Sequence, residues 1–149
     1  MSSPSVGQAL PEWSLPLTTT FVVSSAISTR DFQDVHHDRD LAQAAGSKDI
    51  FVNILTSNAL VERYVTEQLG GPSGTDVDLL GIAIRLGAPA HPGDTLTFSG
   101  TVQEVEGDVV VLHVQAIVRP TAATTDGDHR APAPQHVTGT VRLRTRDAA

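Results

Sequence analysis

The feature that most constrains the fold is a change in the spacing of apolar residues along the chain. Between Asp49 and Leu69 apolar residues recur at intervals of three and four, as on one face of an amphipathic helix, and beyond that stretch they alternate with small or polar residues. Asp49 is placed to cap the helix, and Gly70-Gly71-Pro72 follows its end. The spacing therefore predicts one helix of about five turns, followed by strands.

The alternating part of the chain predicts four half-buried antiparallel strands. They run through residues 80–86, 96–102, 109–118 and 137–143, with a tight turn at Glu106-Gly107-Asp108. Pro120 to Pro134, rich in Ala, Thr, Asp and Pro, predicts a flexible loop. One helix cannot cover both faces of such a sheet, so we expect an α+β hot-dog fold, an antiparallel sheet wrapped around one long central helix. The open strand edges that remain favour pairing with a second copy or a partner.

The part of the chain before the helix is less regular. Residues 1–18 contain three prolines and little periodicity, which predicts an extended N-terminal arm beside a domain of residues 19–149. The β-branched run from Thr19 to Ser28 predicts a first strand, and Arg30 to Asp40 predicts a polar loop dense in Asp and His. Leu41 to Ala45 is expected to form a short helical turn that Gly46 ends.

The composition excludes several kinds of function. The chain has no cysteine, and so no disulfide, thiolate nucleophile or cysteine-based zinc site. Seventeen acidic residues outnumber ten basic ones, and Lys48 is the only lysine, which leaves no basic stripe for nucleic acid. No segment approaches the ~20 apolar residues of a membrane helix, and the first twenty residues do not match a secretory signal. We therefore expect a cytoplasmic protein that binds neither nucleic acid nor membrane.

The loop from Thr29 to Asp38 carries the candidate chemistry. Asp31 and His36 can face each other across a water molecule, so that one takes a proton while the other donates one. Addition of water to an α,β-unsaturated thioester needs such a pair, together with hydrogen-bond donors for the enolate oxygen. A solvated turn without chemistry has the same composition. A metal site is less favoured, because the neighbouring His36 and His37 would point different ways. The other histidines, His91, His113, His129 and His136, are expected to be structural or exposed.

These residues resemble a known motif. Asp31-x4-His36, followed by His37-Asp38, Gly46 and a hydrophobic helix, is similar to the motif of MaoC-like, (R)-specific enoyl-CoA hydratases, and the resemblance covers residues 21–144. The strings from Ser28 to Asp38 and from Gly46 to Thr56 also resemble the small catalytic subunits of actinobacterial steroid enoyl-CoA hydratases, which act on cholesterol side-chain intermediates. The resemblance implies that Asp31 and His36 are the catalytic acid–base pair. It implies no metal and no cofactor beyond the coenzyme A of the substrate.

The start of the central helix departs from the wider family. MaoC-like enzymes usually have Ile-Ala-His-Gly there, whereas this chain has Phe51-Val52-Asn53-Ile54. The resemblance implies that the Ile54 backbone N–H binds the thioester oxygen, because replacement of Gly by Ile keeps that donor. It also implies that Asn53 is a substrate-binding residue. The Asn and Pro that are common before the family's His are absent, replaced by Gln33, Asp34 and Val35.

Two other functions are compatible with the same fold. A hot-dog acyl-CoA thioesterase would work from an acidic residue on the central helix, for which Glu62 and Glu67 are the candidates. A non-catalytic scaffold subunit would only complete a partner's sheet, but such subunits typically lose the residues that correspond to Asp31 and His36. The resemblance to separate-subunit enzymes implies a second MaoC-like subunit in a heterotetramer. That partner would supply much of the wall around the acyl-CoA substrate.

Overall fold

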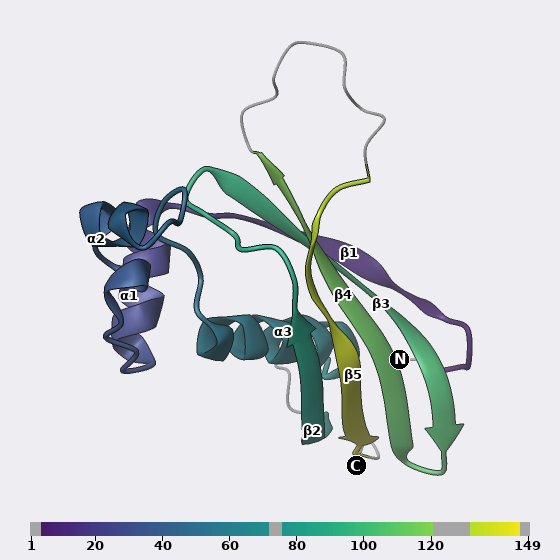
Figure 1. Cartoon of the computed structure of the whole chain (residues 1–149). Coiled ribbons are helices and arrows are strands. Elements are labelled where there is room, and N and C mark those ends of the chain that lie inside the picture. Colours follow the sequence, from purple (N-terminus) through teal and green to yellow (C-terminus); the bar gives the residue numbers. More distant parts are fainter. Residues whose placement is uncertain (1–3, 72–75, 121–131, 147–149) are drawn as a thin grey trace.

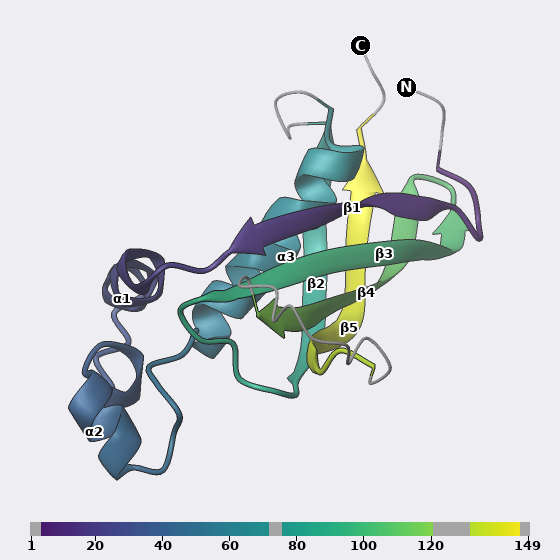
Figure 2. The same cartoon turned by 90° about the horizontal axis from the view of Figure 1, so that it is seen from above.

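A computed structural model describes residues 4–71, 76–120 and 132–146. Five antiparallel strands form one sheet in the order β1-β3-β4-β5-β2. The strands are β1 (Ala9–Pro16), β2 (Val77–Leu86), β3 (Asp94–Glu106), β4 (Val109–Pro120) and β5 (Gln135–Thr145). The long helix α3 (Ile54–Leu69) lies on the concave face of the curved sheet, as Figures 1 and 2 show. The expected hot-dog fold, with a sheet wrapped around one central helix, is confirmed.

The core fills the space between α3 and this concave face. Alternate residues of β3 and β4 point into it, among them Leu96, Phe98, Val102, Leu112 and Val114. The buried face of α3 contributes Leu60, Val61, Tyr64 and Val65. The Tyr64 ring packs against Gly100, where an added Cβ would lie 3.3 Å from the ring. The Tyr64 hydroxyl donates to the Pro11 carbonyl at 3.0 Å, which fixes the helix to the edge of the sheet.

The predicted strand from Thr19 to Ser28 is wrong, because this segment is helix α1 (Thr19–Ser28). Thr18 caps the helix by accepting a hydrogen bond from the Phe21 N–H at 3.0 Å. Val22 and Ala26, four residues apart, are buried on one face. The hydroxyl groups of Ser24, Ser25 and Ser28 each donate to a backbone carbonyl three or four residues earlier in the chain. Packing and capping therefore override the weak strand preference of β-branched residues.

The central helix also begins later than predicted. Asn53 is its N-cap, with Oδ1 accepting a hydrogen bond from the Thr56 N–H at 2.8 Å. Asp49, the predicted cap, instead accepts a hydrogen bond from Nε of Arg39 at 2.9 Å. The apolar residues between Asp49 and Asn53 continue the helical spacing but lie outside the helix. Buried Ile50 and Val52 belong to the core, so their spacing alone did not reveal the true start.

Other sequence predictions agree with the structure. The strands after α3 are confirmed, and so is the tight turn between β3 and β4, where Gly107 has φ 60°. The polar loop holds a short 3-10 turn, η1 (Asp34–His36), and leads into helix α2 (Arg39–Ala44), which Gly46 follows at φ 89°. The N-terminal arm is extended, but its residues Ala9–Pro16 pair with β3 and form an edge strand of the sheet.

Most of the predicted loop between Pro120 and Pro134 lies outside the described residues. Helices α1 and α2 both lie at one end of the sheet, beyond the start of α3 (Figure 1). Within the described ranges, no helix is long and apolar enough to cross a membrane.

The close approach of β5 to β2 gives a prediction at Gly139. An added methyl group would meet the carbonyl oxygen of Ala83 and the Cα of Ile84, which are backbone atoms that cannot turn aside. Gly139→Ala should lower the free energy of unfolding by about 1–3 kcal/mol, measured by urea denaturation. Gly81→Ala on β2 is the matched control, because no described atom lies within 4 Å of its added methyl group. Equal losses in both variants would contradict this packing.

Candidate active site

Asp31 is positioned by the end of helix α1. Arg30 has a left-handed backbone with φ 56°, and the Asp31 N–H donates back to the Ala26 carbonyl at 2.9 Å. The Arg30 N–H donates to the Ile27 carbonyl at 3.0 Å, which completes a Schellman motif. Gly usually occupies the left-handed position, and a side chain there costs about 1 kcal/mol. The turn directs the chain away from the α1 axis, and the Asp31 side chain reaches the start of α3.

His36 is positioned by η1 and by the segment before α3. Its Nδ1 lies 2.8 Å from the Phe51 carbonyl oxygen, which can only accept, so Nδ1 carries a proton. The Phe51 ring packs edge-on against the imidazole, with 4.8 Å between the ring centroids. The Phe51 N–H donates to the Val35 carbonyl at 3.2 Å, which holds the two segments together. Nε2 therefore remains as the ring nitrogen that can gain or lose a proton.

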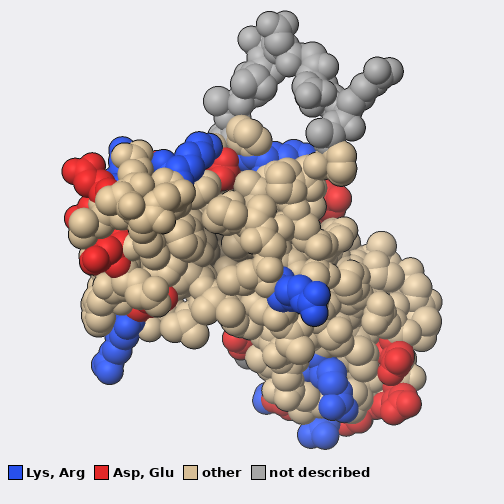
Figure 3. All heavy atoms as spheres, in the orientation of Figure 1, with Lys and Arg blue, Asp and Glu red and all other residues tan. Residues whose placement is uncertain are grey.

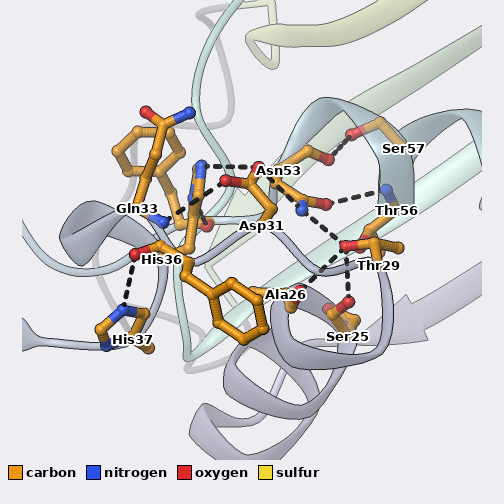
Figure 4. A network of polar contacts seen from close by, with 12 residues as sticks. Ser25, Ala26, Thr29, Asp31, Gln33, His36, His37, Asn53, Thr56 and Ser57 are labelled. Atoms are coloured by element: carbon orange, nitrogen blue, oxygen red, sulfur yellow. Dashed lines mark hydrogen bonds and ion pairs between the residues drawn. The ribbon is translucent and has the colours of Figure 1, made fainter.

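The structure brings these two side chains together, as Figure 4 shows. Oδ2 of Asp31 lies 3.5 Å from Nε2 of His36, and only 14% and 7% of the two side chains are exposed. Asp31 Oδ1 accepts a long hydrogen bond from the Gln33 N–H at 3.4 Å. The separation of Asp31 and His36 is longer than a strong hydrogen bond, yet both groups can contact one water molecule. Their catalytic role stays a prediction.

The first turn of α3 lies beside this pair. Ile54 is the first helical residue, and no described residue accepts a hydrogen bond from its N–H. The N–H also lies at the positive end of the helix dipole, which favours a developing negative charge. Asn53, in contrast, is only 3% exposed, and its amide forms hydrogen bonds with Asp31, Thr29 and Thr56. Substrate contact by Asn53 and oxyanion binding by Ile54 stay predictions.

The two acidic residues considered for a thioesterase lie away from the pair. Glu62 and Glu67 are exposed on α3, and Glu67 accepts a hydrogen bond from Nε of Arg63 at 2.7 Å. On the face that Figure 3 shows, charged side chains of both signs lie in small scattered groups, and most of the surface is uncharged. His37 is also outside the pair, since its Nε2 lies 3.2 Å from the Phe32 carbonyl oxygen. In the described part of the chain, no three His, Asp or Glu side chains are placed to hold one metal ion.

The other histidines differ in their surroundings. His91 and His136 are buried, and each donates from Nδ1 to a backbone carbonyl, that of Ile50 at 2.9 Å and that of Ala88 at 2.8 Å. These contacts agree with the expected structural role. His113 is half-buried on β4, and His129 lies outside the described residues. Ser57 Oγ lies 3.0 Å from Nε2 of His136, and no local sequence pattern predicts this contact between residues 79 positions apart.

Similarity to known proteins supports a hydratase. No known protein-family model matches the chain. The chain is 49% identical over 143 residues to the beta subunit of 3-oxo-4,17-pregnadiene-20-carboxyl-CoA hydratase from Mycobacterium tuberculosis. The matched region covers 96% of this chain and 98% of that relative. The crystal structure of the ChsH1–ChsH2 complex from M. tuberculosis contains a similar chain, with 46% identity and a TM-score of 0.80. The match covers 95% of this chain and 98% of that one. An (R)-hydratase from A. caviae involved in PHA biosynthesis shares the fold, with 19% identity and a TM-score of 0.77. That match covers 97% of this chain and 99% of the hydratase.

The buried His136 gives a prediction about pH. Burial lowers the pKa of His136 from its ordinary value of 6.5, and the hydrogen bond to Ala88 opposes part of this effect. As the pH falls through 6.5, the unfolded chain takes up a proton at this residue before the folded chain does. At higher pH, His136 should therefore have no effect on how the free energy of unfolding depends on pH. As the pH decreases below about 6.5, His136 should lower the free energy of unfolding.

His136→Gln should reduce that acid dependence, measured by urea denaturation across the range from about pH 5 to pH 8. Gln115→Ala, on β4, is the control, because it removes no titratable group, and it should keep the wild-type dependence. A His136→Gln variant with an unchanged pH dependence would contradict the assignment to His136.

Proposed function

The chain belongs to the MaoC-like family of (R)-specific enoyl-CoA hydratases, and from this we propose that it is the catalytic subunit of a hydratase for a steroid side-chain enoyl-CoA. The M. tuberculosis relative is named as the beta subunit of a hydratase for a steroid carboxyl-CoA. The observation that carries the proposal is the convergence of Asp31 Oδ2 and His36 Nε2, 3.5 Å apart, beside the start of α3.

In the proposed reaction Asp31 and His36 share one water molecule. One of the two takes a proton as the water oxygen forms a bond to the β-carbon of the enoyl thioester. The electron pair of the double bond moves toward the thioester carbonyl and forms an enolate. Collapse of the enolate takes a proton from the pair at the α-carbon, so the product contains one added water and the pair returns to its starting protonation state.

The enolate oxygen needs hydrogen-bond donors that are already in place. The N–H of Ile54 is the proposed donor, because it is unpartnered within the described chain and lies at the positive end of α3. Every residue except proline has a backbone N–H, so the donor is retained where Ile54 replaces the family's Gly. Asn53 is retained as a candidate for substrate contact.

An apolar acyl group suits the surroundings of these residues. Several large apolar residues at the site or close to it along the chain are exposed, namely Ile27, Phe32, Leu41, Ile54 and Leu55. Phe32 directly follows Asp31, and Leu55 lies two residues after Asn53. A steroid or a partner subunit would remove such surfaces from water, at about 25 cal/mol for each Å². The identity of the acyl group rests on the named relative.

We also propose a heteromer with a second MaoC-like subunit, with two copies of each chain. The relative is a beta subunit, and the similar solved chain is part of a two-component complex. In this chain β2 pairs with β5 alone among the described strands, and exposed apolar residues lie on it, namely Leu79, Leu80 and Leu86. An open apolar edge of this kind favours strand pairing with another subunit.

The catalytic pair is tested by substitution. Asp31→Asn and His36→Ala should each lower the rate of hydration by about 10² to 10⁴ without loss of the fold, because each removes a general acid or base. The rate is followed by loss of the conjugated double bond of a steroid enoyl-CoA, and free thiol is measured in the same samples. Wild-type protein should consume the double bond without releasing thiol.

His37→Ala is the control for this test, since His37 lies outside the pair, and it should have a smaller effect. Full activity of Asp31→Asn or His36→Ala would reject the pair. Thiol released at the rate of substrate loss would favour a thioesterase, and Glu62 would then be the next residue to replace. If the complex assembles but this chain contributes no hydration activity to it, the chain would be a scaffold subunit.

The partner is tested by size-exclusion chromatography with light scattering. Co-expression with a second MaoC-like chain from the same organism should give a complex with two copies of each chain and higher activity than this chain alone. Leu80→Lys should weaken that complex, because a charge on the strand edge opposes pairing. Glu12→Lys on the opposite edge strand, β1, is the control. A fully active homodimer that ignores the second chain would reject the heteromer.

A further inference from the structure

A buried asparagine connects the two parts of the proposed site. Asn53 Nδ2 donates to Asp31 Oδ2 at 3.0 Å and to Thr29 Oγ1 at 2.9 Å. Its Oδ1 accepts a hydrogen bond from the Thr56 N–H at 2.8 Å and so caps α3. One side chain thus contacts the carboxylate that follows α1 and the helix turn that begins with Ile54. Figure 4 shows these bonds meeting at Asn53.

The surroundings allow only one orientation of the Asn53 amide. Rotation by half a turn would place its oxygen against the Asp31 carboxylate, where two acceptors would repel each other. The same rotation would place its NH₂ group against the Thr56 N–H, where two donors would meet. The present orientation uses both N–H donors and pairs the oxygen. Thr29 is itself held, because its hydroxyl is within bonding distance of the Ser25 and Ala26 carbonyls.

A second layer of contacts fixes Asn53 to the sheet. Ser57 Oγ lies 3.0 Å from the Asn53 carbonyl oxygen and 3.0 Å from Nε2 of His136. His136 is on β5, and its Nδ1 donates to the Ala88 carbonyl at 2.8 Å. The Ser57 hydroxyl and His136 are both buried. The chain of contacts therefore runs from β5 through the first turn of α3 to Asp31.

From these contacts we infer that Asn53 is a positioning residue, whose side chain holds the Asp31 carboxylate in a fixed relation to the Ile54 N–H. This inference rests on the proposed function, because it concerns the geometry of the same reaction. The water activated at Asp31 and His36 must reach the β-carbon while the thioester oxygen lies on the Ile54 N–H. An error of about 1 Å between such groups can lower a rate by about 10².

Asn53→Ser separates this role from helix capping. Ser is a good N-cap, so the first turn of α3 is retained, but its hydroxyl is too short to reach Asp31 while it caps. We expect kcat to fall by about 10- to 100-fold and KM for a steroid enoyl-CoA to change by less than about twofold. A residue that bound substrate directly would instead raise KM.

Asn53→Asp is the second variant and keeps both the size of the side chain and the cap. It replaces the donor to Asp31 with an acceptor, so kcat should fall at least as far as in Asn53→Ser. Thr18→Ser is the matched control, because Thr18 caps α1 through the Phe21 N–H, at the end of that helix opposite to Asp31. It should keep the wild-type kcat. All variants are assayed in the assembly that wild-type protein adopts, with folding checked by circular dichroism.

A double-mutant cycle provides the decisive comparison. If Asn53 acts through Asp31, then Asn53→Ser should lower kcat in the wild-type background and have little further effect in Asp31→Asn. Equal losses in both backgrounds would overturn the inference, as would a raised KM with unchanged kcat or a wild-type kcat in both Asn53 variants. Full activity of Asp31→Asn would instead overturn the proposed function, so the two failures are distinguishable.

Discussion

The hydrogen bonds at the start of α3 are the interaction on which the candidate site depends. The helix is fixed along its length by the core, where Tyr64 packs against Gly100 and bonds to β1. At its first turn, the Asn53 side chain both caps the helix and bonds to Asp31. The rigid helix and sheet thereby determine where a carboxylate from an irregular loop lies. Such support from a packed scaffold is what a catalytic geometry needs.

The two catalytic candidates reach this point by different routes. Asp31 leaves helix α1 through a left-handed turn at Arg30, a position where Gly would be less strained. His36 depends on the segment before α3, because its Nδ1–H donates to the Phe51 carbonyl. That bond determines which ring nitrogen faces Asp31. The hot-dog fold itself would serve a thioesterase equally well, so the hydratase proposal depends on this loop rather than on the sheet.

The parts of the structure that follow from local spacing could be predicted from the sequence. Alternating residues marked β2 to β5, and the three-and-four spacing marked α3, because burial on one face leaves a periodic pattern. Helix α1 was missed, since its capping by Thr18 outweighs the strand preference of its β-branched residues. The start of α3 was misplaced because buried Ile50 and Val52 continue the apolar spacing before the Asn53 cap. Asn53 bonds to Asp31, 22 positions away, and no local pattern records a contact between residues so far apart.

Product analysis in water labelled with oxygen-18 tests most directly whether the chain hydrates an enoyl-CoA. A steroid enoyl-CoA should gain one labelled oxygen as a hydroxyl group on the β-carbon, and the thioester should stay intact. Asp31→Asn should incorporate this label at a rate lower by about 10² to 10⁴. Label in a released carboxylate, or equal incorporation by wild-type protein and Asp31→Asn, would contradict hydration by the Asp31 and His36 pair.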